Sequence, residues 1–412
     1  MSTPPPDGCV VYVLGAFPAP SQTFIAREIR TLLRLGLPLR VFALGREPAA
    51  VLPEEDREWA AAVRFVPDGV TWRILAAHLF FLRRAARRVR YLRALRALVG
   101  LRHRPRYLWL RALYVFWRVV PLARELQAAG GTRHVHAHFA LSQAETALGL
   151  SELLGCRFSF TAHARDIYAS PNALEEKMRA ASFVVTCTRY NADHLRGLCP
   201  ELPAGHVHVI RHGVTCGRDE HREAAGTPLL LGAGRLIAKK GFDVLIDACA
   251  VLRGRGVACD CAIAGEGPLR GALERRIRRA GLQGRVRLLG WQGPEEMERL
   301  YRRASVFSLP SRVVRGRDRD GLPNVLVEAL AHGLPVVSTD VSAIPELVVD
   351  GVTGLLVAPD DPAALAAALA RLLSDARLRL RLGEAGRRLV VERFDLETNT
   401  RQLAELFWPL VS

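Results

Sequence analysis

The stretch Arg319-Asp320-Gly321-Leu322-Pro323-Asn324-Val325-Leu326-Val327-Glu328 carries two carboxylates eight positions apart, with Gly and Pro between them. Proline suits the first position of a helix, where its missing N–H costs nothing, so we expect a helix to begin at Pro323. Gly333 and Pro335 indicate where that helix ends. Asp320 is therefore expected on the loop before the helix, and Glu328 on its second turn.

The N-terminus of this helix is predicted to form an anion-binding site. The first backbone N–H groups of a helix have no partner within it, and they attract negative charge. A carboxylate only accepts hydrogen bonds, so Asp320 and Glu328 beside such a site suit the hydroxyls of a sugar attached to a phosphate. An isolated acidic pair on a solvated loop would be the simpler interpretation, but a second motif favours a ligand.

That second motif is a loop with two cations. Residues 228–236 (PLLLGAGRL) indicate a buried strand ending in a Gly-rich turn, and apolar residues at helical spacing begin at Phe242. Arg235 and Lys240 then flank a loop at the carboxyl end of a strand, where open α/β sheets bind ligands. A planar guanidinium and a compact ammonium together suit a diphosphate, although either alone would more simply be a surface charge.

The order of these motifs resembles glycosyltransferase family 4, whose members are retaining nucleotide-sugar transferases with the two-domain GT-B fold. The family's G-R-L-x-x-x-K-G phosphate loop matches residues 234–241, and its strand into G-x-G-P matches residues 262–268. The resemblance covers most of residues 228–360. This chain departs from the family at Asp320, where Glu is commoner, although some exopolysaccharide-type members have Asp. The other matches are residues 286–291, 306–311, 346–347 and 351–357.

The N-terminal half resembles the exopolysaccharide and colanic-acid-type members of the same family. Residues 17–25 (FPAPSQTFI) resemble the opening of those enzymes, where the first loop helps to form the acceptor side, and we expect Ser21 or Thr23 to cap the following helix. Residues 158–168 (FSFTAHARDIY) resemble the family's T-x-H-x-x-D segment. The resemblance implies that its histidine, His163, lies at the reaction centre.

Clustered histidines could instead bind zinc. His136, His138 and His163 have no C-x-x-C or H-E-x-x-H setting, so we expect no metal site. His136 is better explained as an ordinary, half-buried core histidine. The eight cysteines also lack paired metal spacing, and we expect reduced thiols that are mostly buried.

A chain of 412 residues exceeds the size at which single cores stop growing, so we expect two domains. The alternation of strands and helices predicts an α/β protein with two Rossmann-like, doubly wound parallel sheets. The resemblance adds that they face one cleft and that a C-terminal helix crosses back to the first domain. The expected parts are residues 1–213 (acceptor side), 214–227 (linker), 228–390 (nucleotide sugar) and 391–412 (returning helix). Strands are expected near residues 9–14, 39–44, 62–66, 133–138, 157–161, 182–187 and 206–210, and near 228–233, 259–264, 285–289, 305–309 and 335–339.

The segment 72–125 is not explained by the family motifs. It contains fourteen Arg and a single acidic residue, with apolar and aromatic residues between them. This pattern is typical of a basic amphipathic helix on an anionic membrane surface, but it also suits helices that cover a sheet with a solvated face of arginines. The N-terminus lacks a basic signal-peptide region, and no apolar run reaches the roughly 18 residues of a membrane span. We therefore expect a cytoplasmic protein, either free or held at the inner face of the cytoplasmic membrane.

The resemblance implies transfer of a sugar from a nucleotide diphosphate sugar to a hydroxyl of a glycan or lipid-linked glycan, with retention of configuration and without a metal or cofactor. By position in the motifs, Asp320 would contact sugar hydroxyls, Glu328 the nucleotide ribose, and His163 the transferred sugar. The other expected donor-site residues are Gly234, Arg235 and Lys240 at the diphosphate, Gly321, Leu322 and Pro323 at the helix start, and Gly290 near the base.

Three alternative functions differ in the motifs that they require. A sugar-nucleotide 2-epimerase has a related fold and also binds a nucleotide sugar, but its motifs differ. A dinucleotide oxidoreductase requires G-x-G-x-x-G, and the runs that begin at Gly232 and Gly265 both lack the third Gly. The net charge of +17 would suit a nucleic-acid binder, but no recognised binding motif occurs, so we expect no nucleic-acid partner.

Overall fold

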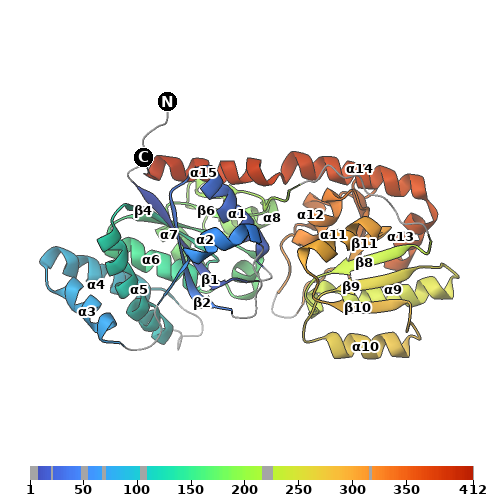
Figure 1. Cartoon of the computed structure of the whole chain (residues 1–412), viewed down its shortest axis with the longest axis horizontal. Helices are drawn as coiled ribbons and strands as arrows, with labels where there is room; N and C mark the ends of the chain where they lie inside the picture. The colour runs from blue at the N-terminus through green and yellow to red at the C-terminus, as the bar shows by residue number, and fades with distance from the viewer. Residues whose placement is uncertain are drawn as a thin grey trace. The chain divides into compact units, whose positions relative to one another are not determined.

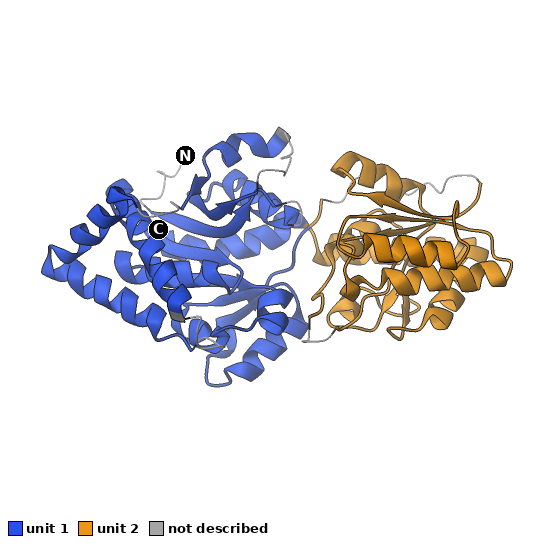
Figure 2. Ribbon diagram, turned by 90° about the horizontal axis from the view of Figure 1, so that it is seen from below, with its two compact units in different colours: residues 1–213, 396–412 blue, residues 214–395 orange. Residues whose placement is uncertain are grey.

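The computed structural model describes residues 8–19, 22–47, 54–66, 71–102, 109–215, 226–314 and 318–411. The chain forms two compact units (Figure 2). Unit 1 consists of residues 1–213 and 396–412, and unit 2 consists of residues 214–395. Most of the predicted linker, residues 216–225, lies outside the described residues.

Unit 1 contains a seven-stranded parallel sheet with the order β3-β2-β1-β4-β5-β6-β7. Each strand lies where the sequence predicted one. Parallel strands require helical crossovers, which cover both faces of the sheet and explain its continuous apolar strands. The strands are β1 (Cys9–Phe17), β2 (Leu39–Arg46), β3 (Arg64–Phe65), β4 (Thr132–His138), β5 (Arg157–Ala162), β6 (Val184–Thr186) and β7 (Val207–Val209).

The N-cap residue of helix α1 differs from the sequence prediction. Helix α1 has Gln22 as its N-cap residue, without a side-chain hydrogen bond, and Thr23 already has helical geometry. The other predicted cap, Ser21, lies outside the described residues. The helices are α1 (Thr23–Arg34), α2 (Arg57–Ala61), α3 (Trp72–Leu82), α4 (Ala85–Val99), α5 (Trp109–Ala129), α6 (Ser142–Leu154), α7 (Leu174–Ala180), α8 (Arg189–Leu198) and α15 (Leu396–Val411).

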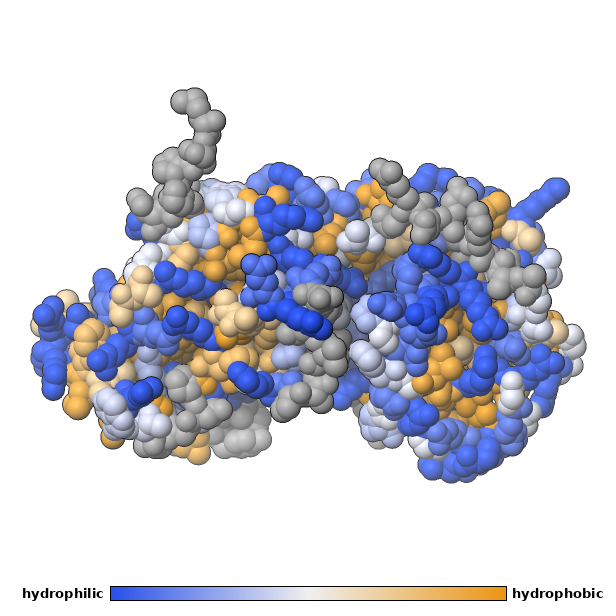
Figure 3. Space-filling view, viewed as in Figure 1, coloured by the Kyte–Doolittle hydropathy of each residue, from blue (hydrophilic) through white to orange (hydrophobic). Residues whose placement is uncertain are grey.

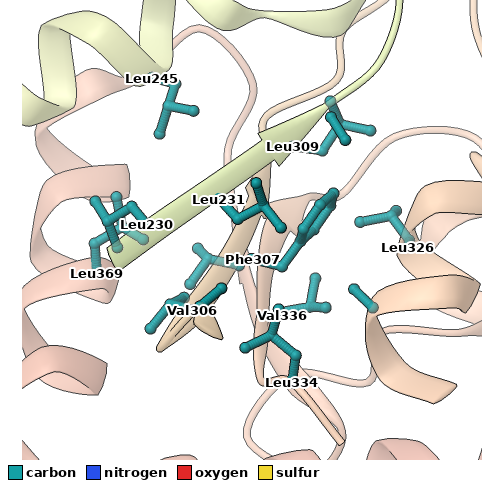
Figure 4. Packing of buried hydrophobic residues seen from close by; sticks show 14 of the residues in the cluster. Leu230, Leu231, Leu245, Val306, Phe307, Leu309, Leu326, Leu334, Val336 and Leu369 are labelled. Carbon is teal, nitrogen blue, oxygen red and sulfur yellow. The ribbon is translucent and has the colours of Figure 1, made fainter. Parts of the chain in front are cut away.

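Unit 2 contains a six-stranded parallel sheet with the order β10-β9-β8-β11-β12-β13. Figure 4 shows its core, where Leu231 of β8, Phe307 of β11 and Val336 of β12 lie together. The short edge strand β13 was not predicted as a strand, although its residues belong to a recognised motif. The strands are β8 (Leu229–Ala233), β9 (Asp260–Ala264), β10 (Val286–Gly290), β11 (Val306–Leu309), β12 (Val336–Thr339) and β13 (Gly354–Val357).

The helices of unit 2 are α9 (Phe242–Gly254), α10 (Arg270–Arg279), α11 (Pro294–Arg303), α12 (Asn324–Ala331), α13 (Pro362–Ser374) and α14 (Ala376–Arg393). Helix α12 begins one residue later than predicted. Pro323 is its N-cap, with φ −66° and an extended ψ of 121°, and its carbonyl accepts the first helical hydrogen bond from Leu326. Gly333 ends the helix as predicted, because its φ of 70° turns the chain and lets the N–H of Leu334 reach the Ala329 carbonyl at 3.1 Å.

The C-terminal helix begins later than predicted. Residues 391–393 are the last turn of α14, and Phe394 is buried in the core of unit 2. Its carbonyl accepts a hydrogen bond from the N–H of Val214 at 2.8 Å, so residues 391–395 belong to unit 2. Helix α15, which begins at Leu396, packs against α1, β1 and β4 of unit 1 (Figure 1). There the buried ring of Phe407 contacts those of Tyr12 and His136.

Candidate active site

The predicted site residues fall into two groups. His163 lies in unit 1, and all the others lie in unit 2. In each unit they follow the carboxyl ends of parallel strands, which is where open α/β sheets bind ligands.

The cationic loop of unit 2 follows β8. Gly234 and Gly241 stand at its two ends, both with positive φ. A Cβ atom on Gly241 would lie 1.9 Å from the carbonyl oxygen of Pro310, so only glycine allows the loop to approach the end of β11 this closely. Arg235 is exposed and forms no ion pair with any described residue, which leaves its guanidinium available to an anion.

Lys240 and Asp320, both predicted from the sequence as site residues, contact each other. The Nζ of Lys240 lies 2.7 Å from Oδ2 of Asp320, and the Nζ of Lys239 lies 3.5 Å from Oδ1. Burial alone would raise the pKa of the Asp320 carboxyl, but the two lysines outweigh burial and hold this pKa below its ordinary value. Asp320 is therefore ionised at neutral pH.

The Oδ2 atom of Asp320 is buried, and its contact with Lys240 does not meet the geometry of a hydrogen bond. The contact with Lys240 is thus an ion pair that leaves a lone pair of Oδ2 unused. A hydroxyl group of a ligand could donate to it.

Two residues of this site were not predicted. Lys239 makes an ion pair with Asp318 at 2.9 Å in addition to its contact with Asp320. Arg312 donates from Nε to the Ala238 carbonyl at 2.8 Å and also binds Asp243 and Asp360, which holds the cationic loop in place. Lys239 is adjacent to Lys240 in the sequence, but the G-R-L-x-x-x-K-G motif specifies a lysine only at position 240. Nothing in the sequence near Arg312 indicated its role.

The start of α12 lies next to Asp320. Gly321 and Pro323 are buried and Leu322 is half-buried. Glu328 is half-buried on the second turn, where its Oε2 accepts a hydrogen bond from the hydroxyl of Tyr301 at 3.2 Å.

Gly290 ends β10 with a φ of 79°, and its carbonyl accepts a hydrogen bond from the N–H of Gly265 at 2.7 Å. The indole of the next residue, Trp291, is 59% exposed. A planar base could stack on such a ring.

In unit 1, His163 is held by a buried carboxyl group. The Oδ1 atom of Asp166 accepts from the backbone N–H of His163 at 3.0 Å, and Oδ2 accepts from the N–H of Ala140. Asp166 therefore joins the loops that follow β4 and β5. Burial raises its pKa to about 7, and the backbone donors and Lys177 oppose this shift only in part.

The His163 ring is buried among aromatic side chains. Its centroid lies 4.4 Å from that of Phe139, 5.4 Å from Phe24 and 5.3 Å from His212. Burial lowers the pKa of His163 well below its ordinary value, and the neighbouring His212 and His138 add to the effect. The imidazole is therefore neutral at neutral pH and can either donate or accept one hydrogen bond.

The other two predicted histidines have protein partners. His136 contacts the hydroxyls of Ser159 at 2.7 Å and Thr161 at 2.9 Å, so it is a core residue, although fully rather than half buried. The Nε2 of His138 lies 3.0 Å from a carboxylate oxygen of Glu28.

A cavity of about 730 Å³ lies elsewhere on unit 1. It is lined by residues 39–42, at the amino end of β2, and by the last turns of α1 and α5. We do not assign it to the nucleotide sugar, because His163 lies at the opposite, carboxyl end of the same sheet.

The geometry of unit 2 agrees with a known family. Residues 227–375 match the family model described as Glycosyl transferases group 1. Unit 2 contains a glycosyl transferases group 1 domain. All the predicted donor-site residues of unit 2 lie within this group 1 domain.

Proteins similar in sequence include named glycosyltransferases. The chain is 37% identical over 207 residues to the amylovoran biosynthesis glycosyltransferase AmsK of Erwinia amylovora. The aligned residues make up 50% of this chain and 51% of that protein. It is 32% identical over 242 residues to the alpha-D-kanosaminyltransferase of Streptomyces kanamyceticus, covering 56% and 61%. The chain thus spans about half the length of the first relative and less than two thirds of the second.

Solved structures resemble the whole chain at low sequence identity. A glycosyltransferase from Rickettsia africae ESF-5 aligns with a TM-score of 0.70 at 15% identity, over 98% of this chain and 99% of that one. HepE of Anabaena, in complex with UDP and glucose, aligns with a TM-score of 0.70 at 17% identity, over 98% and 100%. At these identities the likeness shows the fold alone. Together with the two parallel sheets, it confirms the predicted GT-B fold, in which a group 1 domain follows a second Rossmann-like domain.

Proposed function

We propose that this chain is a retaining glycosyltransferase. It moves a sugar from a nucleotide diphosphate sugar to a hydroxyl of a glycan or lipid-linked glycan, in the biosynthesis of a cell-surface polysaccharide. The group 1 domain supports the transferase activity, and the name of AmsK supports an exopolysaccharide as the product. Both relatives reported above are glycosyltransferases, which does not favour the epimerase alternative.

The observation that carries the proposal is the contact between Lys240 and Asp320. It places a cation for phosphate and an acceptor for sugar hydroxyls side by side, within one half-buried cluster. A nucleotide diphosphate sugar presents both chemistries next to each other, because its anomeric carbon is bonded directly to the terminal phosphate.

The residues of unit 2 have separate roles in this proposal. Arg235, Lys240 and the N–H groups at the start of α12 hold the diphosphate as negative charge builds on the leaving group. Preorganised donors of this kind are typically worth about 3–4 kcal/mol each in a transition state. Asp320 accepts hydrogen bonds from the sugar, and Glu328 accepts them from the ribose. Because side-chain cations meet the charge of the diphosphate, we expect catalysis to need no metal ion.

His163 orients the transferred sugar through its neutral imidazole, while Asp166 holds its backbone. No side chain is assigned as a nucleophile, and retention then follows a front-face course in which the leaving diphosphate and the incoming hydroxyl share one face of the sugar. The outcome is tested by nuclear magnetic resonance, since the anomeric coupling of the product must match that of the donor.

We further propose that unit 1 binds an anionic membrane surface through α3 and α4. In the described part of the chain no helix is long and apolar enough to span a bilayer. The two helices form the outer layer of unit 1, over α5 and α6 (Figure 1). Both present apolar side chains to solvent at helical spacing, namely Trp72, Leu75, Leu79 and Leu82 on α3, and Val89, Leu92 and Val99 on α4.

Arginines accompany these apolar residues, and Figure 3 shows polar and apolar side chains mixed over this end of the molecule. Arg83, Arg84 and Arg88 are exposed and have no acidic partner among the described residues. Other arginines of the segment serve the protein itself, because Arg87 covers the ring of Phe80 at 3.8 Å and Arg90 binds the Leu154 carbonyl. The basic surface is thus smaller than the sequence suggested. A lipid-linked acceptor would explain its location on the acceptor-side unit.

The proposed activity is tested first by a thermal-shift screen of UDP-, GDP- and ADP-sugars. A donor at 100 times its dissociation constant stabilises the folded chain by about 2.7 kcal/mol, which a melting curve resolves. The donor so identified is then used in a transfer assay, with Asp320→Ala as the inactive comparison. If no nucleotide sugar raises the melting temperature, the assignment of the donor site is wrong.

A further inference from the structure

Three side chains that can bind a metal meet at the carboxyl ends of three neighbouring strands of unit 1. His163 follows β5, Cys187 follows β6 and His212 follows β7, and these strands are adjacent in the sheet. One ligand atom of each residue lies within 4.8 Å of those of the other two. The three residues lie far apart in the sequence and belong to no known metal-binding motif, so their sequence positions alone do not indicate a site.

His163 has an unsatisfied atom in this cluster. The side chain is 7% exposed, and its Nε2 is buried without a hydrogen-bond partner among the described residues. Leaving such an atom unsatisfied destabilises the fold, and most buried polar atoms have a partner.

The surrounding side chains hold the other two ligands. The Nδ2 of Asn191 lies 4.0 Å from the sulfur of Cys187, and the same amide is held by the Tyr168 hydroxyl at 3.1 Å. The ring of Phe24 stacks on that of His212, with 4.0 Å between the centroids. Cys187 is therefore positioned by the amide of Asn191, and His212 by the ring of Phe24.

We propose that His163, Cys187 and His212 form a binding site for a divalent transition-metal ion, with Zn²⁺ the best match to two imidazoles and one thiolate. Zinc takes nitrogen at about 2.0–2.1 Å and sulfur at about 2.3 Å, so tetrahedral ligand atoms of two imidazoles and one thiolate stand about 3.3–3.6 Å apart. The cluster reaches this geometry when its ligand atoms close by up to about 1.5 Å. Magnesium and calcium prefer oxygen ligands and do not fit this set.

Three protein ligands leave one zinc position open to water or another ligand. Bound zinc would also occupy the ring nitrogen of His163, so it would inhibit sugar transfer. This consequence rests on the proposed function, whereas the metal site itself does not.

The test uses the full chain, reduced and stripped of metal. Zn²⁺ is titrated in competition with a chromophoric chelator, and Co²⁺ is added separately as a spectroscopic substitute. We expect one equivalent of zinc per chain and a thiolate-to-cobalt charge-transfer band. Cys187→Ser and His212→Gln should each weaken zinc binding at least about tenfold, and Cys187→Ser should remove the band.

The matched control is Cys156→Ser, which removes a thiol at the opposite, amino end of β5 and should keep both signals. The proposal is overturned if the wild type binds no zinc at micromolar concentration, if neither variant changes the affinity, or if the cobalt band survives Cys187→Ser. Circular dichroism checks the fold of each variant, and His212→Gln decides the outcome should Cys187→Ser fail to fold.

Inhibition of transfer is then measured relative to the rate of each variant without zinc. Wild type and Cys156→Ser should be inhibited, and Cys187→Ser should not. A wild type without transferase activity would count against the proposed function alone, because the zinc and cobalt signals do not depend on it.

Discussion

The Nζ of Lys240 lies 2.7 Å from Oδ2 of Asp320, and this ion pair joins the loop after β8 to the loop before α12. A diphosphate that binds Lys240 must compete with this carboxylate. Asp320 then exchanges part of its contact with the ammonium for a sugar hydroxyl, which its unaligned Oδ2 can accept. In the proposed function, binding of the phosphate and binding of the sugar are thereby linked through these two residues.

We expect Arg235→Ala and Lys240→Ala each to weaken binding of the donor's nucleotide diphosphate. A charge-assisted hydrogen bond contributes about 1.5–3 kcal/mol, which corresponds to roughly 10- to 100-fold in affinity. Isothermal titration calorimetry measures the change. Arg278→Ala, on the exposed face of α10, is the control and should bind as the wild type does. Unchanged affinity in both loop variants would show that the phosphate binds elsewhere.

Substitutions of the two carboxylates should have different effects on transfer and on nucleotide binding. We expect Asp320→Ala to abolish transfer but to keep nucleotide binding nearly intact, because Asp320 faces the sugar. Glu328→Ala should weaken binding of the nucleotide itself. Tyr301→Phe removes only the hydroxyl that donates to Glu328, so it should cause a smaller loss of the same kind. Equal losses of nucleotide affinity in Asp320→Ala and Glu328→Ala would mean that the roles are wrongly divided.

Gly241→Ala should destabilise unit 2 strongly. Its φ of 68° strains an L-residue, and the added Cβ would lie 1.9 Å from the Pro310 carbonyl oxygen. We expect a loss of at least about 2–3 kcal/mol. Gly254→Ala, at the end of α9, meets no atom within 4 Å and should be neutral or slightly stabilising. Urea unfolding followed by circular dichroism compares the two, and similar midpoints would contradict the prediction.

The buried carboxyl of Asp166 should give unit 1 a distinctive pH dependence. Burial raises its pKa from 3.8 to about 7. Between these values the folded protein holds a proton that the unfolded chain has released. The group therefore stabilises the fold at low pH, and this contribution is lost as the pH rises through about 7. The buried histidines act in the opposite direction, since burial lowers the pKa of His134, for example, to about 3.

The comparison of Asp166→Asn with the wild type isolates this one group. The variant should gain relative stability as the pH rises from 5 to 7, by up to about 1.4 kcal/mol per pH unit, and the difference should level off above pH 7. Urea unfolding is followed by tryptophan fluorescence, because five of the six tryptophans belong to unit 1. A difference that stays constant with pH would show that Asp166 has an ordinary pKa.

Membrane binding should depend on charge and on salt. We expect the chain to sediment with vesicles that contain anionic lipid, and less so as salt rises. Replacing Arg83, Arg84 and Arg88 with Gln should weaken binding by about 1 kcal/mol per arginine. Arg87 is left in place because it packs on Phe80.

The control for that experiment removes the same charge from unit 2 by replacing Arg275, Arg278 and Arg279 of α10, all exposed, with Gln. It should bind as the wild type does. Equal binding to neutral and anionic vesicles, no binding at low salt, or an equal loss in the control would each reject the membrane surface.

The strands were predictable because most of them contain a short run of buried apolar residues, and twelve of the thirteen were expected. The exception, β13, is only four residues long. Helix ends were less predictable. Gln22 caps α1 without a side-chain bond, and the single break at Phe394 separates two helices that the sequence pattern did not resolve.

The site was predictable only in part. Arg235, Lys240 and Asp320 stand in motifs, and the carboxyl ends of parallel strands bring such motifs together. The partners outside motifs were missed, because Lys239, Arg312, Cys187 and His212 gain their roles from packing between segments far apart in the chain. Sequence spacing carries no signal for contacts of that kind.

Unit 1 is closed by α15, so its core is built from two segments that are separated in the sequence by the whole of unit 2. Domains tend to fold as their segments leave the ribosome, earlier segments first. Unit 2 is one continuous segment that precedes α15 in the chain. The strands β1 and β4 lack the Phe407 ring that packs on Tyr12 and His136 until α15 has been made. The unit whose first residues are translated earliest therefore cannot complete its core until all of unit 2 has been translated.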